Sequence, residues 1–195
     1  MTSVVYIKSY NAPEIDKKEI LRYAGVRGES PEVEALLDEC IVGLSDKLSY
    51  KVCYCVIPVS DIPRCFGDDA RPLMERLSDC EKTVLFAATV GVGIDRLIAR
   101  YSRVSESRAL IYQAIGSERV EALCDAFEAD IRADFSQSGK AVSPRFSPGY
   151  GKLPLKMQRT VFSLLDCQRQ IGISLSDSLL MSPSKSVTAF IGIKK

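Results

Sequence analysis

The longest regular pattern in the 195-residue sequence is helical, and it constrains the fold more than any other feature. Apolar residues recur every three or four positions from Ile94 to Tyr101 and again from Ser105 to about Phe135. This spacing puts them on one face of a helix, with acidic residues such as Glu118 and Glu121 towards water. The sequence therefore predicts a long central helix that is either continuous or interrupted near Gly116.

Two shorter helices are predicted before it. The first covers Pro13 to Tyr23 and is ended by Gly25. The second begins at Ser30-Pro31-Glu32, where serine suits the N-cap and proline suits the first helical position. Its apolar residues keep helical spacing, so we expect it to run to about Leu48.

Strands alternate with further helices in the rest of the chain. Tyr50 to Val59 and the continuously apolar segment Thr83 to Val90 are predicted strands, and Ile173–Leu175 and Ser186–Ile193 form two more. A short helix is expected from Pro72 to Leu77. Leu155 to Gln170 is predicted to be one amphipathic helix closed by Gly172, with these residues buried: Leu155, Val161, Leu164 and Leu165.

The order of these elements favours an α+β domain with a mainly antiparallel sheet over a regular parallel array. No internal repeat or change in composition divides the chain, so we expect one domain over residues 1–195. Within it, residues 1–79 form a helical leader with the first strand, and residues 80–195 form the core.

Charge and hydropathy exclude several classes of function. The 26 basic and 25 acidic side chains are interspersed, which disfavours a nucleic-acid or membrane partner. The longest apolar runs, Val52–Val59 and Thr83–Ile94, are too short to span a bilayer, and the start Met1-Thr2-Ser3-Val4 is unlike a signal peptide. The expected compartment is the cytoplasm.

The chain has seven cysteines and no histidine. Without histidine, a Ser-His or Cys-His nucleophile and an imidazole zinc site are both impossible. Cys53 and Cys55 lie on one face of a predicted strand, and their spacing does not match common zinc or redox motifs. We therefore expect reduced thiols that fill the core, and no metal site.

Two turns are candidate binding sites. Gly91-Val92-Gly93 follows a predicted strand, but Leu97 stands near the place of the third glycine of a dinucleotide fingerprint, so a structural turn is favoured. Arg145-Phe146-Ser147-Pro148-Gly149-Tyr150 joins a guanidinium fork, a tight turn and an aromatic face, and could hold a small zwitterion. The alternative is an arginine that caps a helix terminus beside a proline turn.

Several segments together resemble the S-adenosylmethionine-binding activation domain of cobalamin-dependent methionine synthase. Arg145 to Tyr150 matches the Arg-x-x-x-Gly-Tyr motif of that family, and Met181 to Val187 resembles its Met-x-Pro-x-x-Ser-Val stretch. Thr83 to Asp95 resembles its apolar strand, and Val120 to Phe127 resembles part of its long helix. The resemblance covers about residues 80–193, and the preceding part looks like the leader helices of free-standing members.

The resemblance implies roles for individual residues. Arg145 would hold the carboxylate of S-adenosylmethionine, and the backbone at Ser147 and Gly149 would line its methionine part. Tyr150 would lie where the corrinoid meets the methyl donor, which makes it the residue nearest the chemistry. Asp125, which by default is a solvated surface residue like Asp130, falls where the family tends to have glutamate.

The implied function is that of a reactivation subunit in a cobalamin-dependent methyltransferase system. It would bind S-adenosylmethionine and support reductive remethylation of cobalamin on a methionine synthase without its own activation domain, or on another corrinoid protein, with a flavodoxin-type reductant as a further partner. The alternative is a non-catalytic interaction module that keeps the fold without the methyl-transfer role. An autonomous methyltransferase would need an acceptor pocket that the sequence does not indicate.

Overall fold

A four-stranded sheet with helices on both faces forms the centre of the computed structural model, which describes residues 4–28, 30–44 and 46–195. The strands are ordered β1-β2-β3-β6, and every neighbouring pair is antiparallel. A second, two-stranded sheet pairs β4 with β5. The strands are β1 (Tyr6–Tyr10), β2 (Tyr50–Pro58), β3 (Cys80–Thr89), β4 (Ser174–Leu175), β5 (Met181–Ser182) and β6 (Ser186–Lys194).

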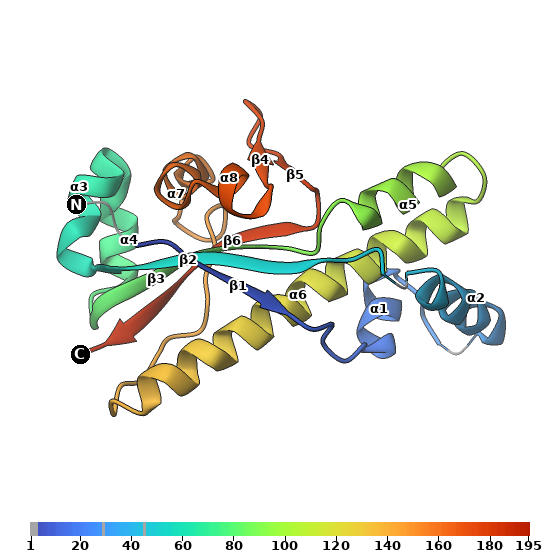
Figure 1. Cartoon of the computed structure of the whole chain (residues 1–195), viewed down its shortest axis with the longest axis horizontal. Coiled ribbons are helices and arrows are strands. Elements are labelled where there is room, and N and C mark those ends of the chain that lie inside the picture. The colour runs from blue at the N-terminus through green and yellow to red at the C-terminus, as the bar shows by residue number, and fades with distance from the viewer. Residues whose placement is uncertain (1–3, 29, 45) are drawn as a thin grey trace.

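The helices form a layer on each side of the large sheet. In Figure 1 the long helix α6 crosses one face, and α7 and α8 lie over the other. Their bounds are α1 (Lys17–Tyr23), α2 (Pro31–Val42), α3 (Ile62–Phe66), α4 (Ala70–Arg76), α5 (Gly93–Tyr101), α6 (Glu106–Ser136), α7 (Met157–Leu165) and α8 (Cys167–Ile171), with short 3-10 turns at Val59–Asp61 and Gly67–Asp69. The predicted α+β class and antiparallel sheet are confirmed.

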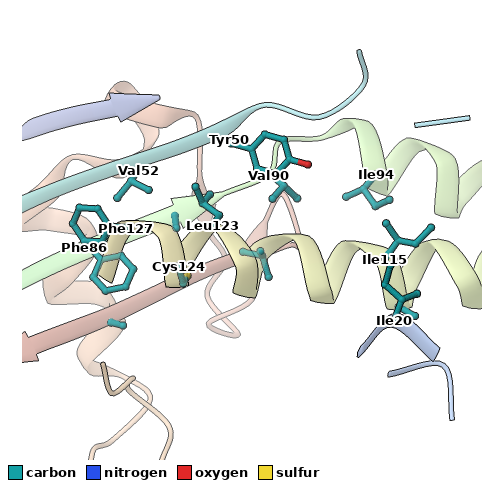
Figure 2. Close-up of a cluster of buried hydrophobic side chains, with 14 of the residues drawn as sticks. Ile20, Tyr50, Val52, Phe86, Val90, Ile94, Ile115, Leu123, Cys124 and Phe127 are labelled. Atoms are coloured by element: carbon teal, nitrogen blue, oxygen red, sulfur yellow. The ribbon is translucent and has the colours of Figure 1, made fainter. Parts of the chain in front are cut away.

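Strand alternation divides the core into two hydrophobic clusters. Val84 and Phe86 of β3 belong to the cluster under α6, whereas Leu85 and Ala87 belong to the cluster under α7 and α8. All four side chains are fully buried, because β3 is covered on both faces. Figure 2 shows the first cluster, in which the ring of Phe127 from α6 lies 4.8 Å from that of Phe86.

The predicted helix starts are confirmed more closely than the predicted ends. Ser30 caps α2 by accepting a hydrogen bond from the Val33 N–H, as expected. The helix ends at Val42 and not near Leu48, and Gly43 is its C-cap residue. A Cβ on Gly43 would lie 2.7 Å from the Tyr112 hydroxyl, so a larger residue there would require the Tyr112 side chain of α6 to shift.

The long central helix is continuous over 31 residues, so Gly116 does not interrupt it. Gly116 instead allows close packing, since a Cβ there would lie 2.8 Å from Cγ of Lys185 and 3.0 Å from Cγ1 of Ile94. Gly116 therefore serves the packing of α6 and does not end the helix.

The single helix predicted from Leu155 to Gln170 is wrong, because Asp166 adopts a left-handed conformation and separates α7 from α8. Val161 and Leu165 are buried as predicted, Leu164 is only half-buried, and Leu155 precedes α7 and is exposed. Gly172 closes α8 in a left-handed conformation, as expected.

The sequence did not predict strand β1, because its first expected element was the helix beginning at Pro13. The outward face of β1 is exposed, and polar side chains dock it on α6: the Lys8 ammonium lies 2.5 Å from Asp130, and the Tyr10 hydroxyl donates to the same carboxylate at 2.7 Å. These hydrogen bonds from Lys8 and Tyr10 lower the pKa of Asp130. Asp130 is therefore a structural anchor, although the sequence indicated only solvated surface.

A buried ion pair fixes the link between β1 and α1. Glu118 and Arg119 of α6 are almost fully buried and bond to each other, so the prediction that Glu118 faces water is wrong. Arg119 also donates to the carbonyl oxygens of Pro13 and Glu14 at 2.6 Å, and Glu118 accepts the Asp16 N–H at 3.2 Å. The pair thus supplies partners for backbone groups that would otherwise be unsatisfied.

Glu118→Gln is expected to lower the free energy of unfolding by about 3–5 kcal/mol, because it leaves the Arg119 guanidinium buried without its counter-charge. The measurement is urea denaturation followed by circular dichroism. Glu39→Gln is the matched control, since it breaks an exposed pair with Arg108 and should cost less than about 1 kcal/mol. Equal losses in the two variants would contradict the structural role of the buried pair.

Candidate functional site

The segment that carries Arg145 runs along the outer edge of β6. The Phe146 N–H donates to the Phe190 carbonyl at 3.0 Å, and the Phe190 N–H donates back at 2.9 Å. The Phe146 ring stacks on Phe190, which belongs to the cluster under α7 and α8. Because side chains alternate along an extended segment, Arg145 is directed to the opposite face, towards α6.

Arg145 meets three carboxylates on α6. Its Nη2 lies 2.7 Å from Glu121, and its Nη1 lies 2.5 Å from Asp125 and 3.2 Å from Glu128. Burial acts to lower the pKa of Arg145, but its hydrogen bonds to Glu121 and Asp125 outweigh this and raise the pKa above its usual value. The guanidinium therefore binds the middle of a helix face, and the alternative of a cap on a helix terminus is wrong.

The second motif segment reaches the same face of α6. Nζ of Lys185 donates to Oγ of Ser117 at 3.0 Å, and its side chain crosses the helix at Gly116. Ser117 precedes Glu121 by four residues, so the two side chains are neighbours about 6 Å apart along the helix axis. Burial lowers the pKa of Lys185, while Asp95 acts in the opposite direction. Arg145 and Lys185 are thus two cations on one helix face.

Hydrogen bonds fix the turn that presents Lys185. The Ser184 N–H donates to the Asp95 carboxylate at 2.8 Å. The Ser186 hydroxyl contacts the Pro183 carbonyl oxygen at 2.8 Å and the Thr89 hydroxyl at 2.9 Å. The Met181 to Val187 stretch therefore contains β5 and a hydrogen-bonded turn before β6.

The turn after Arg145 has the tight geometry that Pro148-Gly149 predicts. Gly149 has a φ of +90°, and its N–H donates to the Leu153 carbonyl at 2.9 Å. The Tyr150 N–H donates to the backbone carbonyl of Ser147. The Gly149 N–H is consequently used within the turn. Ser147, Gly149 and Tyr150 follow directly on the segment that holds Arg145 beside β6.

Tyr150 is 77% exposed and lines a different hollow from the face that holds Arg145. This cavity of about 430 Å³ lies between the turn and α4, and its walls are Pro72, Glu75, Arg76, Tyr150, Gly151, Lys152 and Leu153. Arg76 lies over the Phe146 ring, with its guanidinium carbon 5.3 Å from the ring centroid. The structure thus brings Arg145 and Lys185 together on α6 and turns Tyr150 towards α4.

The glycine turn at the end of β3 has a structural explanation. A Cβ on Gly93 would lie 1.8 Å from the Lys47 carbonyl oxygen, and one on Gly91 would lie 2.4 Å from the Ser49 hydroxyl. The backbone of this turn is therefore covered by residues 47–49. The structural alternative to a dinucleotide site fits this geometry.

Sequence reasoning missed the partners of Arg145 and also one cavity. Glu121, Asp125 and Glu128 are spaced as one stripe of α6, which was the available signal. The cavity, of about 510 Å³, is lined by the N-terminal segments and by Tyr50 and Arg119, and none of the predicted site residues lines it.

Among the described residues no group of three or more His, Cys, Asp or Glu side chains forms a metal site, and none of the helices has the length and apolar character of a membrane span.

The fold and the placement of both motifs define an α+β domain of the activation-domain type. The family model of the vitamin B12 dependent methionine synthase activation domain matches residues 63–195, more than half of the chain, and the protein belongs to that family. The chain is also similar to the crystal structure of the MetH reactivation domain bound to AdoHcy. The TM-score is 0.71 at 15% identity, over 97% of this chain and 78% of that one, which shows a shared fold. The expected family is confirmed.

Gly149→Ala is expected to destabilise the protein more than Gly139→Ala. Both glycines have positive φ, so each substitution costs about 1–2 kcal/mol of backbone strain. At Gly149 the φ is larger and the new Cβ would also lie 3.0 Å from Cδ1 of Leu155, whereas Gly139 has open space around it. Unfolding free energies from urea titrations measure the difference, and a smaller cost at Gly149 would argue against a tightly held turn.

Proposed function

We propose that this protein binds S-adenosylmethionine at Arg145 and supports reductive remethylation of cobalamin carried by another protein. Membership of the activation-domain family supports this, as does the likeness to a reactivation domain that binds AdoHcy. The observation that carries the proposal is the position of Arg145. Its guanidinium is bonded to three carboxylates of α6. Lys185, from the second motif segment, bonds to the same face of this helix.

The charges around Arg145 suit the methionine end of this ligand. The guanidinium can grip the ligand's carboxylate in two places. Three carboxylates and one guanidinium carry a net charge of −2, which favours a ligand whose ammonium and sulfonium give it a net positive charge. We propose that Asp125 receives the ammonium, because it is the most exposed of the three acids.

The turn after Arg145 would line the rest of the methionine part. Ser147 would do so with its backbone, while Gly149 would contribute the shape of the turn, because its own N–H is bonded to Leu153. Tyr150 is proposed to lie where the corrinoid meets the methyl donor. Its exposed side chain is accessible to a partner, but it lines the hollow beside α4 and not the α6 face that holds Arg145. The cations Arg76 and Lys152 beside it belong to the same proposed surface.

The chemistry demands little acid or base from this chain. A sulfonium methyl group is already activated, and reduced cobalamin on the partner supplies the nucleophile, so this protein's contribution is to bind and orient the donor. The proposed partner is a corrinoid protein or a methionine synthase without its own activation domain, with a flavodoxin-type reductant, in the cytoplasm. We propose that residues 1–195 act as one unit, since β1 and β2 extend the sheet of β3 and β6.

Arg145→Lys is expected to weaken S-adenosylmethionine binding by about tenfold to a hundredfold in calorimetric titration. Lysine keeps the charge but loses the planar fork that takes a carboxylate in two places, and a charge-assisted hydrogen bond contributes about 1.5–3 kcal/mol. The variant keeps an ion pair with α6, so circular dichroism should show an intact fold.

Arg132→Ala is the matched control, because Arg132 is an exposed arginine that pairs with Glu128 on the same helix. It should leave the affinity within about threefold. Equal weakening in both variants would assign the effect to general electrostatics. An absence of binding to the wild-type protein would favour the alternative of an interaction module without a methyl-transfer role.

A further inference from the structure

The three acids around Arg145 are not equivalent. Glu128 is only 15% exposed and is held in place by Arg132 at 2.9 Å and by the Arg145 N–H at 3.3 Å. Glu121 is 44% exposed, and among the described residues its carboxylate bonds only to Nη2 of Arg145. Asp125 is 69% exposed and is likewise held by one hydrogen bond, from Nη1. Glu121 and Asp125 can therefore each leave the guanidinium with the loss of a single hydrogen bond, whereas Glu128 cannot.

The nitrogen atoms of the guanidinium also differ in how many hydrogen bonds they already donate. Nη1 already serves two carboxylates, Asp125 and Glu128. Nε of Arg145 donates to no residue within the described part of the chain, and Nη2 is bonded only to Glu121. A ligand carboxylate that takes the Nε and Nη2 donors together would have to displace Glu121 and could leave the Nη1 contacts unchanged.

Lys185 offers a second position for the displaced carboxylate. Its Nζ bonds to Ser117, which neighbours Glu121 on the helix surface, and an ammonium has three donors. Burial lowers the pKa of Lys185, and the nearby charge of Asp95 only partly opposes this. A carboxylate arriving there would stabilise the ammonium.

We propose that Glu121 is an internal competitor for the ligand's carboxylate. It closes Arg145 in the unliganded protein and moves to Lys185 when the ligand binds. The inference rests on the proposed binding of S-adenosylmethionine at Arg145 and adds a residue that sets its affinity. The apparent affinity is reduced by the fraction of protein in which Glu121 occupies Arg145.

The test is calorimetric titration of S-adenosylmethionine into Glu121→Gln and Glu128→Gln. Both variants remove one negative charge beside the same arginine, but only Glu121→Gln removes the competitor. We expect Glu121→Gln to bind about tenfold more tightly than the wild-type protein, and Glu128→Gln to show no such gain. A gain of the same size in both variants would overturn the inference.

Lys185→Met tests the second position through a double-mutant cycle. It should weaken ligand binding severalfold in the wild-type background, where Glu121 needs a new partner, and should have no effect in the Glu121→Gln background. Equal effects in the two backgrounds would overturn the role of Lys185.

Failure of this inference can be distinguished from failure of the proposed function. If the wild-type protein binds the ligand and Arg145→Lys weakens it, but Glu121→Gln binds no more tightly, only the competitor role is overturned. If neither the wild-type protein nor Glu121→Gln binds, both are overturned. Binding by Glu121→Gln alone would support both.

Discussion

The packing of α6 on the central sheet is the interaction on which the rest of the structure depends. Phe127 inserts between Phe86 and Tyr54, which fixes the rotation of the helix about its axis. Once that rotation is set, helical periodicity directs the Glu118–Arg119 pair to the link before α1 and Asp130 to β1. The same periodicity directs Glu121, Asp125 and Glu128 to the edge of β6, where they meet Arg145.

This arrangement places the candidate site on rigid elements. Arg145 is held on the helix side by three carboxylates and on the sheet side by the paired backbone of Phe146, so a small displacement of either element would change its geometry. In the proposed competitor role of Glu121, the part of the site that moves is a single side chain. A site built like this can tune affinity through one acid without moving the backbone.

The sequence predicted the features that depend on local periodicity and short motifs. The long helix, the Ser30 cap, strands β2, β3 and β6, and the Arg145 turn all carry such signals. It could not predict that Glu121, Asp125 and Glu128 surround Arg145, because their meeting depends on how the chain after α6 returns along β6. The sequence did not indicate the break at Asp166, because α7 and α8 share one apolar pattern. It did not indicate β1, because Lys8 and Tyr10 of this strand bond to α6 through polar groups.

The most direct measurement of the central claim is a two-dimensional ¹H–¹⁵N spectrum of the arginine side chains during titration with S-adenosylmethionine. If the ligand binds at Arg145, the Arg145 Nε–H signal should shift, because this donor has no hydrogen-bond partner among the described residues, and backbone signals of α6 near Glu121 should shift with it. An unchanged Arg145 signal, with shifts confined to the N-terminal cavity beside Tyr50, would contradict the account and place the ligand elsewhere.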